Sequence, residues 1–160
     1  MTFIRRLAIA LTASVVAGAV AATTIAFANP ALNAVTTVLG HRATLSDSVQ
    51  VNEDRVKFQT KDPTDMIVQK VTFQPLGNSG WHYHPGVVLV VVESGHVTTH
   101  DANCQTKTYG PAEAFVESGN LPFMVSNESS SEVAVDFATV VSPAGGPFRV
   151  ETDPPACAQP

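Results

Sequence analysis

The segment that decides the fold reads Gly80-Trp-His-Tyr-His-Pro-Gly-Val-Val-Leu-Val-Val-Val-Glu-Ser-Gly95. His82 and His84 share one face of an extended segment, because side chains in a strand alternate with a period of two. Residues 87–92 form an uninterrupted apolar run that is bounded by turn residues and is too short to span a membrane. Such a run predicts a fully buried strand. A pair of imidazoles just before a buried strand indicates a metal site inside a β-barrel.

Residues 1–28 have the pattern of a signal peptide. Arg5 and Arg6 give a positive start, an apolar stretch follows, and Ala26-Phe-Ala28 matches a cleavage signal. An uncleaved anchor is the alternative, because residues 7–28 are nearly long enough to cross a bilayer. The arginine pair leaves both Sec and twin-arginine export open. We therefore expect a secreted or cell-envelope protein with no stable membrane span after cleavage.

The composition describes one acidic domain. The chain has 160 residues, with 9 Lys and Arg against 14 Asp and Glu, and two of the arginines lie in the leader. No basic run is present that could follow a phosphate backbone, so nucleic acid is not expected as a partner. The remainder is long enough for a single core, and its acidity is typical of a soluble exported protein.

The chain has two cysteines, Cys104 and Cys157. In an exported protein such a pair predicts one structural disulfide, and no C-x-x-C motif suggests a redox or metal role. The bond would tie the Pro- and Gly-rich tail at residues 143–160 to a loop in the middle of the domain.

Short β-like segments separated by Gly, Pro and Asp turns fill the rest of the chain, with no helical period and no internal repeat. The expected strands are residues 49–51, 56–58, 66–73, 87–92, 96–101, 114–116, 123–125 and 133–141. This pattern predicts an all-β sandwich or barrel over residues 43–142. Residues 29–42 are expected to be a lead-in, either flexible or a short surface helix.

These features resemble the cupin superfamily over most of the mature chain. His82 and His84 match the H-x-H of the first cupin motif, and Gly95 matches its closing glycine. Gly110 and Asn127 fit the frame of the second motif. The segments Trp81-His-Tyr-His-Pro-Gly86 and Ala114-Phe-Val-Glu117 are similar to those of secreted single-domain cupins of actinobacteria. The resemblance implies a jelly-roll barrel, also called a double-stranded β-helix, that holds a divalent metal with three histidines and one glutamate.

Two positions depart from the cupin ligand set. The family glutamate would fall at Val88 and the third histidine at Phe123. Neither side chain can ligate a metal, so we expect a degenerate site in which Val88 and Phe123 line an apolar pocket. Glu117, near a strand end at the barrel mouth, is the third candidate ligand beside His82 and His84. On this basis Fe²⁺, Mn²⁺ or Zn²⁺ would bind weakly or not at all.

Three other polar residues are expected to lie on the protein surface. Glu93 is expected to face outward by parity. His96 and His100 lie too far apart on a strand to chelate easily, so both are expected to be solvated.

Two functions remain open at this stage. The first is an exported cupin that binds a small molecule in its barrel without catalysis. The alternative is a metal-dependent enzyme of the dioxygenase or isomerase type that uses His82 and His84. A third, structural idea is a cell-envelope interaction domain, with pairing of two copies as a further expectation. The sequence gives no catalytic residue.

Overall fold

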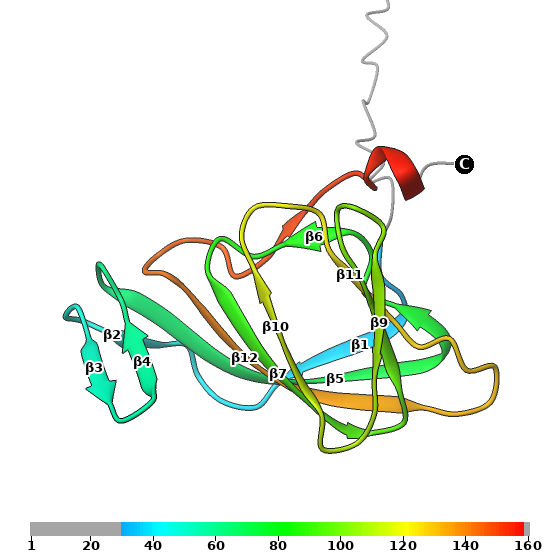
Figure 1. Ribbon diagram of the computed structural model, residues 1–160, viewed down its shortest axis with the longest axis horizontal. Coiled ribbons are helices and arrows are strands. Elements are labelled where there is room, and N and C mark those ends of the chain that lie inside the picture. The colour runs from blue at the N-terminus through cyan, green and yellow to red at the C-terminus, as the bar shows by residue number, and fades with distance from the viewer. Residues whose placement is uncertain (1–29, 159–160) are drawn as a thin grey trace, which may run out of the picture.

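The computed structural model describes residues 30–158, so the expected leader at residues 1–28 falls outside the described residues. One large antiparallel sheet has the order β10-β7-β12-β5-β11-β8-β9, and β1 and β2 also pair with β5. Its strands are β1 (Leu32–Val38), β2 (Ala43–Leu45), β5 (Thr64–Asn78), β7 (Val87–Ser94), β8 (Val97–His100), β9 (Thr106–Tyr109), β10 (Ala114–Ser118), β11 (Met124–Ser126) and β12 (Ala134–Pro143). The sheet curls into a nearly closed ring (Figure 1). This architecture is an all-β, nearly closed antiparallel barrel of the jelly-roll kind and confirms the predicted fold class.

Two small strand pairs accompany the barrel. β3 (Gln50–Glu53) and β4 (Val56–Gln59) form a hairpin that projects to one side in Figure 1. β6 (His82–Tyr83) pairs with β13 (Val150–Glu151) at the barrel rim, and the 3-10 turn η1 (Ala156–Ala158) follows. No helix within residues 30–158 combines the length and apolar character needed to cross a bilayer.

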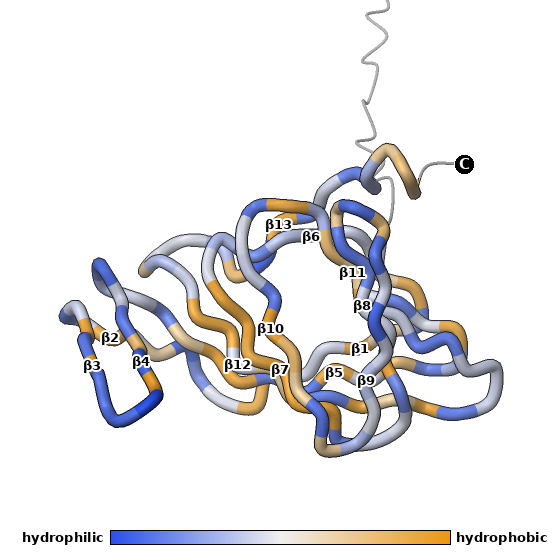
Figure 2. The backbone as a smooth tube through the Cα atoms, in the orientation of Figure 1, coloured by the Kyte–Doolittle hydropathy of each residue, from blue (hydrophilic) through white to orange (hydrophobic). Residues whose placement is uncertain are grey.

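The core lies between the inward faces of the long strands. Phe73 on β5, Val88 and Val92 on β7, Val97 on β8 and Val140 on β12 are almost completely buried. Burial of each such side chain contributes about 1.5–3 kcal/mol. The hydrophobic stretches of β5, β7 and β12 are visible in Figure 2.

The burial of strand β7 differs from the prediction. β7 alternates between buried and exposed residues, and Leu89 and Val91 are 48% and 49% exposed. The prediction of a fully buried strand is therefore wrong, because β7 lies in a barrel wall that has only one covered face.

The lead-in also differs from its expectation, since residues 32–38 form neither a helix nor a loop. They make strand β1, whose residues pair with β5 from Val38↔Gln69 to Leu32↔Asn78. The site described below uses residues from this strand.

Two glycines permit close backbone approach at the ends of β7. Gly95 has φ 68°, and a Cβ there would lie 2.5 Å from the Val133 carbonyl oxygen. A Cβ on Gly86 would collide with the Val141 carbonyl oxygen. Both contacts require glycine, which fixes where β7 begins and ends against β12.

Asn127 organises the turn between β11 and β12 from a buried position. Its Nδ2 donates to the carbonyls of Phe73, Gln74 and Glu132, and its Oδ1 accepts from the Ser129 amide. The side chain thus satisfies backbone groups that would otherwise be buried without partners.

The predicted disulfide is confirmed, with Cys104 bonded to Cys157. It joins the turn between β8 and β9 to η1, and thereby holds the tail that supplies β13 to the barrel rim.

Candidate metal centre

Strand β6 carries the H-x-H pair at the rim of the barrel. Its backbone pairs with β13 on one side, and His82 exchanges two backbone hydrogen bonds with Phe123 on the other. The alternation of a strand places His82 and His84 on the same side, with Tyr83 opposite. Their rings lie edge to face, with centroids 4.9 Å apart.

Hydrogen bonds to backbone carbonyls orient both imidazoles. Nδ1 of His82 lies 2.9 Å from the Gly80 oxygen, and Nδ1 of His84 lies 2.5 Å from the Phe148 oxygen. A carbonyl only accepts, so each Nδ1 carries a hydrogen. In the neutral rings, each Nε2 then presents a lone pair toward the barrel interior.

Glu117 brings a carboxylate to the same point. It lies on β10, buried and directly opposite Val88 of β7, with the inward parity that also buries Phe115. Its Oε2 lies 3.5 Å from His82 Nε2 and 3.3 Å from His84 Nε2. Within residues 30–158 this oxygen has no hydrogen-bond partner of proper geometry.

The three facing atoms require a positive charge between them. With both Nδ1 positions protonated, two imidazole lone pairs point at a buried carboxylate oxygen, and all three atoms are acceptors. Burial raises the pKa of Glu117, but the attraction and hydrogen-bonding capacity of His82 and His84 outweigh burial and lower this pKa to about 2. Either a proton on an imidazole or a metal ion can supply the missing charge.

The spacing of the donor atoms fits a metal ion. Two ligands at about 2.1 Å from a tetrahedral ion are about 3.4 Å apart, which matches both Glu117–histidine distances. The ligand atoms of His82, His84 and Glu117 all lie within 4.8 Å of one another. Histidines that ligate metals typically donate their other nitrogen to a carbonyl or carboxylate, as both do here. These residues could therefore hold a divalent ion as a 2-His-1-carboxylate set.

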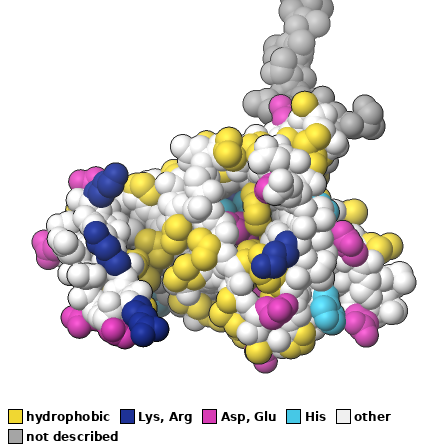
Figure 3. All heavy atoms as spheres, in the orientation of Figure 1, with side chains coloured by type: hydrophobic (Ala, Val, Ile, Leu, Met, Phe, Trp, Pro, Cys, Tyr) yellow, Lys and Arg dark blue, Asp and Glu magenta, His cyan; other side chains and the backbone are white. Residues whose placement is uncertain are grey.

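A cavity of about 290 Å³ adjoins these three side chains inside the barrel. Figure 3 shows the hollow at the barrel opening, with histidine and acidic side chains inside it. Apolar residues of β5, β7 and β12 form much of its wall, including Val71, Val88, Val90 and Ala138. This volume lies just below the about 300–1,000 Å³ range of small-molecule sites.

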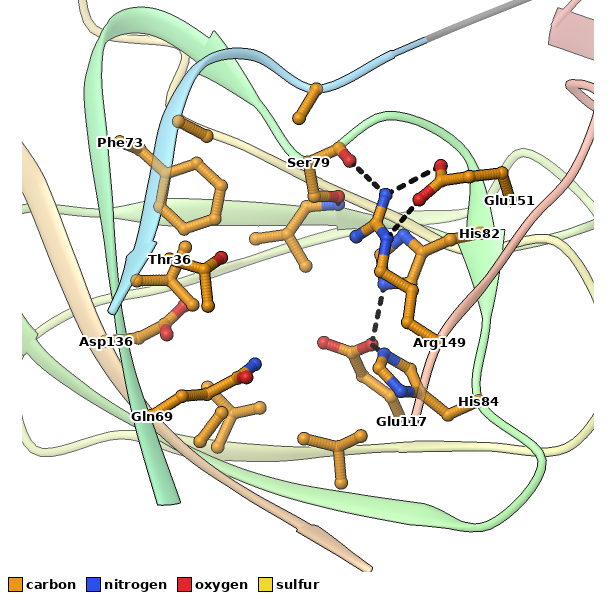
Figure 4. Close-up of a pocket in the computed structure, with 17 residues that line it drawn as sticks. Thr36, Gln69, Phe73, Ser79, His82, His84, Glu117, Asp136, Arg149 and Glu151 are labelled. Carbon is orange, nitrogen blue, oxygen red and sulfur yellow. Dashed lines mark hydrogen bonds and ion pairs between the residues drawn. The ribbon is translucent and has the colours of Figure 1, made fainter. Parts of the chain in front are cut away.

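The tail contributes an ion pair beside the histidines. The Arg149 guanidinium donates to both Glu151 oxygens, at 2.5 and 2.9 Å, and to the Ser79 carbonyl at 2.5 Å. The hydrogen bond from Arg149 lowers the pKa of Glu151. Figure 4 shows this pair next to His82, where it adds no net charge to the cavity.

The cavity wall across from the histidines carries a second carboxyl group. Asp136 of β12 is 3% exposed, and its Oδ1 makes no hydrogen bond to any atom of residues 30–158. Burial, and secondly repulsion by Glu117, raises the pKa of Asp136 to about 7. The group therefore exchanges its proton near neutral pH.

Only one of the two residues that were expected to line an apolar pocket does so. Val88 lines the cavity, and Glu117, the third candidate ligand, lies directly opposite it on β10. Phe123 is half-buried and packs against the core, with its backbone bonded to His82, and it is not among the residues that line the cavity.

Of the three residues that were expected at the surface, two are exposed and one is half-buried. Glu93 and His96 are exposed, as expected. His100 is half-buried, 2.8 Å from Ser126 Oγ, with its ring edge to face with Trp81 at 6.4 Å. The prediction of a solvated His100 is wrong, because β8 turns this face toward β11 and Trp81.

Sequence reasoning did not find Arg149, Glu151 or Asp136. The first two lie in a tail that has no strand pattern, and only its pairing with β6 brings them to the site. Asp136 offered one signal: it is the one charged residue of strand β12.

Comparisons with known proteins find only distant similarity. No family model matches the chain, and no curated protein matches it. Among solved structures, a cupin domain from Bordetella pertussis Tohama I is 18% identical, with 69% of this chain and 95% of that chain covered and a TM-score of 0.47. A cupin-like protein from Thermotoga maritima is 19% identical, with 56% and 65% covered and a TM-score of 0.48.

An oxalate oxidase in complex with glycolate is also similar, at 18% identity and a TM-score of 0.45, with 53% of this chain and 45% of that chain covered. This chain thus spans less than half the length of that enzyme. At these identities and TM-scores the similarity carries no conclusion about this chain.

Proposed function

We propose that this chain is a cupin-fold protein that binds one divalent metal through His82, His84 and Glu117 and uses it to act on a small molecule in the barrel. The observation that carries the proposal is the convergence of two imidazole nitrogens on one buried carboxylate oxygen, which has no hydrogen-bond partner among residues 30–158.

Three protein ligands favour catalysis over a structural role. Structural zinc sites are closed by four protein ligands, whereas catalytic sites keep positions open for water or substrate. The open side here faces the cavity of about 290 Å³. A bound metal would supply Lewis acidity at that side, and a 2-His-1-carboxylate set is the donor set of non-haem iron oxygenases. We therefore place the metalloenzyme ahead of the non-catalytic binder.

The chain's own groups have defined tasks in this proposal. The Gly80 and Phe148 carbonyls hold the two imidazoles in the ligating tautomer. The apolar residues Val71, Val88, Val90 and Ala138 shape the cavity in which the small molecule would lie beside the metal.

We also propose that the protein works outside the cytoplasm. The Cys104–Cys157 disulfide is consistent with export, because such bonds persist in oxidising compartments. Amino-terminal sequencing of the secreted protein tests this, and a mature chain that begins near Asn29 is the expected result.

The metal is tested by reconstitution of protein purified without chelator or affinity tag. After loading with Fe²⁺ without oxygen, or with Mn²⁺ or Zn²⁺, elemental analysis should find about one ion per chain. His82→Ala, His84→Ala and Glu117→Gln should each weaken binding by at least about 100-fold. His96→Ala and Glu93→Gln are matched controls on the exposed surface and should bind as the parent does.

Binding well below one equivalent with all three metals would contradict the proposal. An equal loss in the control variants would contradict the assignment of the ligands. Circular dichroism checks that each variant retains the β-sheet spectrum.

A further inference from the structure

Asp136 is a buried acid that the metal centre does not use. It lies on the inner face of β12 and points into the cavity from the wall across from His82, His84 and Glu117 (Figure 4). Its Oδ1 is buried without a hydrogen-bond partner in the described part of the chain. Such a group costs free energy in the folded protein unless something in the cavity pairs with it.

No cation of the cavity wall is available to it. Among the described residues that line the cavity, Arg149 is the only lysine or arginine. Its guanidinium is already bound by Glu151 and by the Ser79 carbonyl on the opposite side. A partner for Asp136 therefore has to come with the ligand.

Two neighbours complete a set of hydrogen-bond acceptors. Val71 of β5 pairs with Thr36 of β1 on one side and with Asp136 of β12 on the other, which places the three residues in one row on the inner face. Gln69 lies two residues along β5 on the same face. Thr36 and Gln69 also line the cavity, and Figure 4 shows both beside Asp136.

This arrangement suits a protonated amine. An ammonium has three donors and no acceptor, and the Asp136 carboxylate, the Gln69 amide oxygen and the Thr36 hydroxyl can each accept one hydrogen bond. A hydroxyl group brings one donor and would leave the carboxylate charge unbalanced. Charge also balances along the cavity, since Glu117 and a carboxylate of the ligand together offset a divalent ion.

We propose that Asp136, with Gln69 and Thr36, binds the primary amine of a small amino-carboxylate whose carboxylate end faces the metal. The metal end of this inference rests on the proposed function, whereas the amine end rests on Asp136 alone.

The amine end is tested first on metal-free Glu117→Gln protein, because Glu117 with His82 and His84 would otherwise offer a cation a second site in the same cavity. Propyl- to hexylammonium and the alcohols of equal length are titrated against it and followed by NMR chemical shifts. Each ammonium should bind at least about tenfold more tightly than its alcohol. Asp136→Asn should abolish this preference, while Asp54→Asn, the same change in an exposed turn, should keep it. Equal binding of alcohols, or a preference that survives in Asp136→Asn, would overturn the inference.

The second series uses Zn²⁺-loaded protein and compares ω-amino, ω-hydroxy and unsubstituted carboxylates of three to six carbons. At the best length the amino acid should bind at least about tenfold more tightly than the other two. If amines are preferred but no metal binds, the proposed function fails and the amine site stands. If metal binds and no amine preference is found in either series, the amine site fails and the metal centre stands.

Discussion

Asp136→Asn should stabilise the metal-free protein at alkaline pH. Burial, and secondly Glu117, raises the pKa of Asp136 from 3.8 to about 7. Between these two values the folded protein binds the proton that the unfolded chain releases, so the free energy of unfolding falls as pH rises. The destabilisation is absent below about pH 4 and complete above about pH 7. Asparagine has the same shape and stays neutral throughout.

The magnitude follows from the size of the shift. A rise of about 3 pKa units at 1.36 kcal/mol each amounts to about 4 kcal/mol of lost stability above pH 7. At pH 5 only about 1.6 kcal/mol of this penalty is present. The advantage of Asp136→Asn over the parent should therefore grow by about 3 kcal/mol between pH 5 and pH 8.

Urea unfolding at pH 5 and pH 8, in the presence of a chelator, measures this growth directly. Asp54→Asn controls for the general loss of one negative charge, because Asp54 lies exposed in the turn between β3 and β4. An advantage that is equal at the two pH values would refute the reasoning. The reasoning would also be refuted if the free energy of unfolding of the parent rose by about 3 kcal/mol from pH 5 to pH 8, where a fall of this size is predicted.

Three further predictions concern the scaffold. Cys157→Ser removes the bond to Cys104 and opens a loop of 53 residues, so unfolding in urea should become easier by up to about 4 kcal/mol; no change would show that the bond adds nothing to stability. Asn127→Ala removes the amide that donates to three carbonyls in one buried and two part-buried hydrogen bonds, and should cost about 2–4 kcal/mol, measured by the same assay; a loss below 0.5 kcal/mol, about the size of a neutral surface change, would contradict this. The hydrogen bond from Thr44, with further bonds, lowers the pKa of Asp65 to about 2, so its stabilisation is complete above about pH 4 and is lost as pH falls through 2; Asp65→Asn should be less stable than the parent at pH 7 and should approach it near pH 2.

The barrel was predictable from the sequence because its strands are short, apolar in alternation and separated by strong turn residues. The alternation of buried and exposed residues in β7 was not predictable from its run of valines and leucine. A run without polar residues does not indicate which side chains face inward. Whether a face of β7 is buried depends on how the strands pair and curl around the core, which the sequence of β7 alone does not show.

The metal centre illustrates the same limit at residue level. His82 and His84 were readable because two residues of separation on one strand fix their common face. Glu117 was recognised only as a weak third candidate, because its position opposite Val88 depends on the register between β10 and β7. Glu117 on β10 can thus supply the carboxylate that Val88, its cross-strand neighbour on β7, lacks.

The tail and the cavity wall extend this point. Arg149 and Glu151 reach the site only because β13 pairs with β6. Asp136 acquires its raised pKa from burial and from Glu117, and neither can be read from the residues that flank it in sequence.

The most direct test of the central claim is X-ray diffraction from crystals grown with Mn²⁺, with data collected so that manganese scatters anomalously. The account predicts one peak per chain, between His82 Nε2, His84 Nε2 and Glu117 Oε2, at about 2.0–2.3 Å from each. A map with full manganese in the crystal and no peak between these three atoms would contradict it.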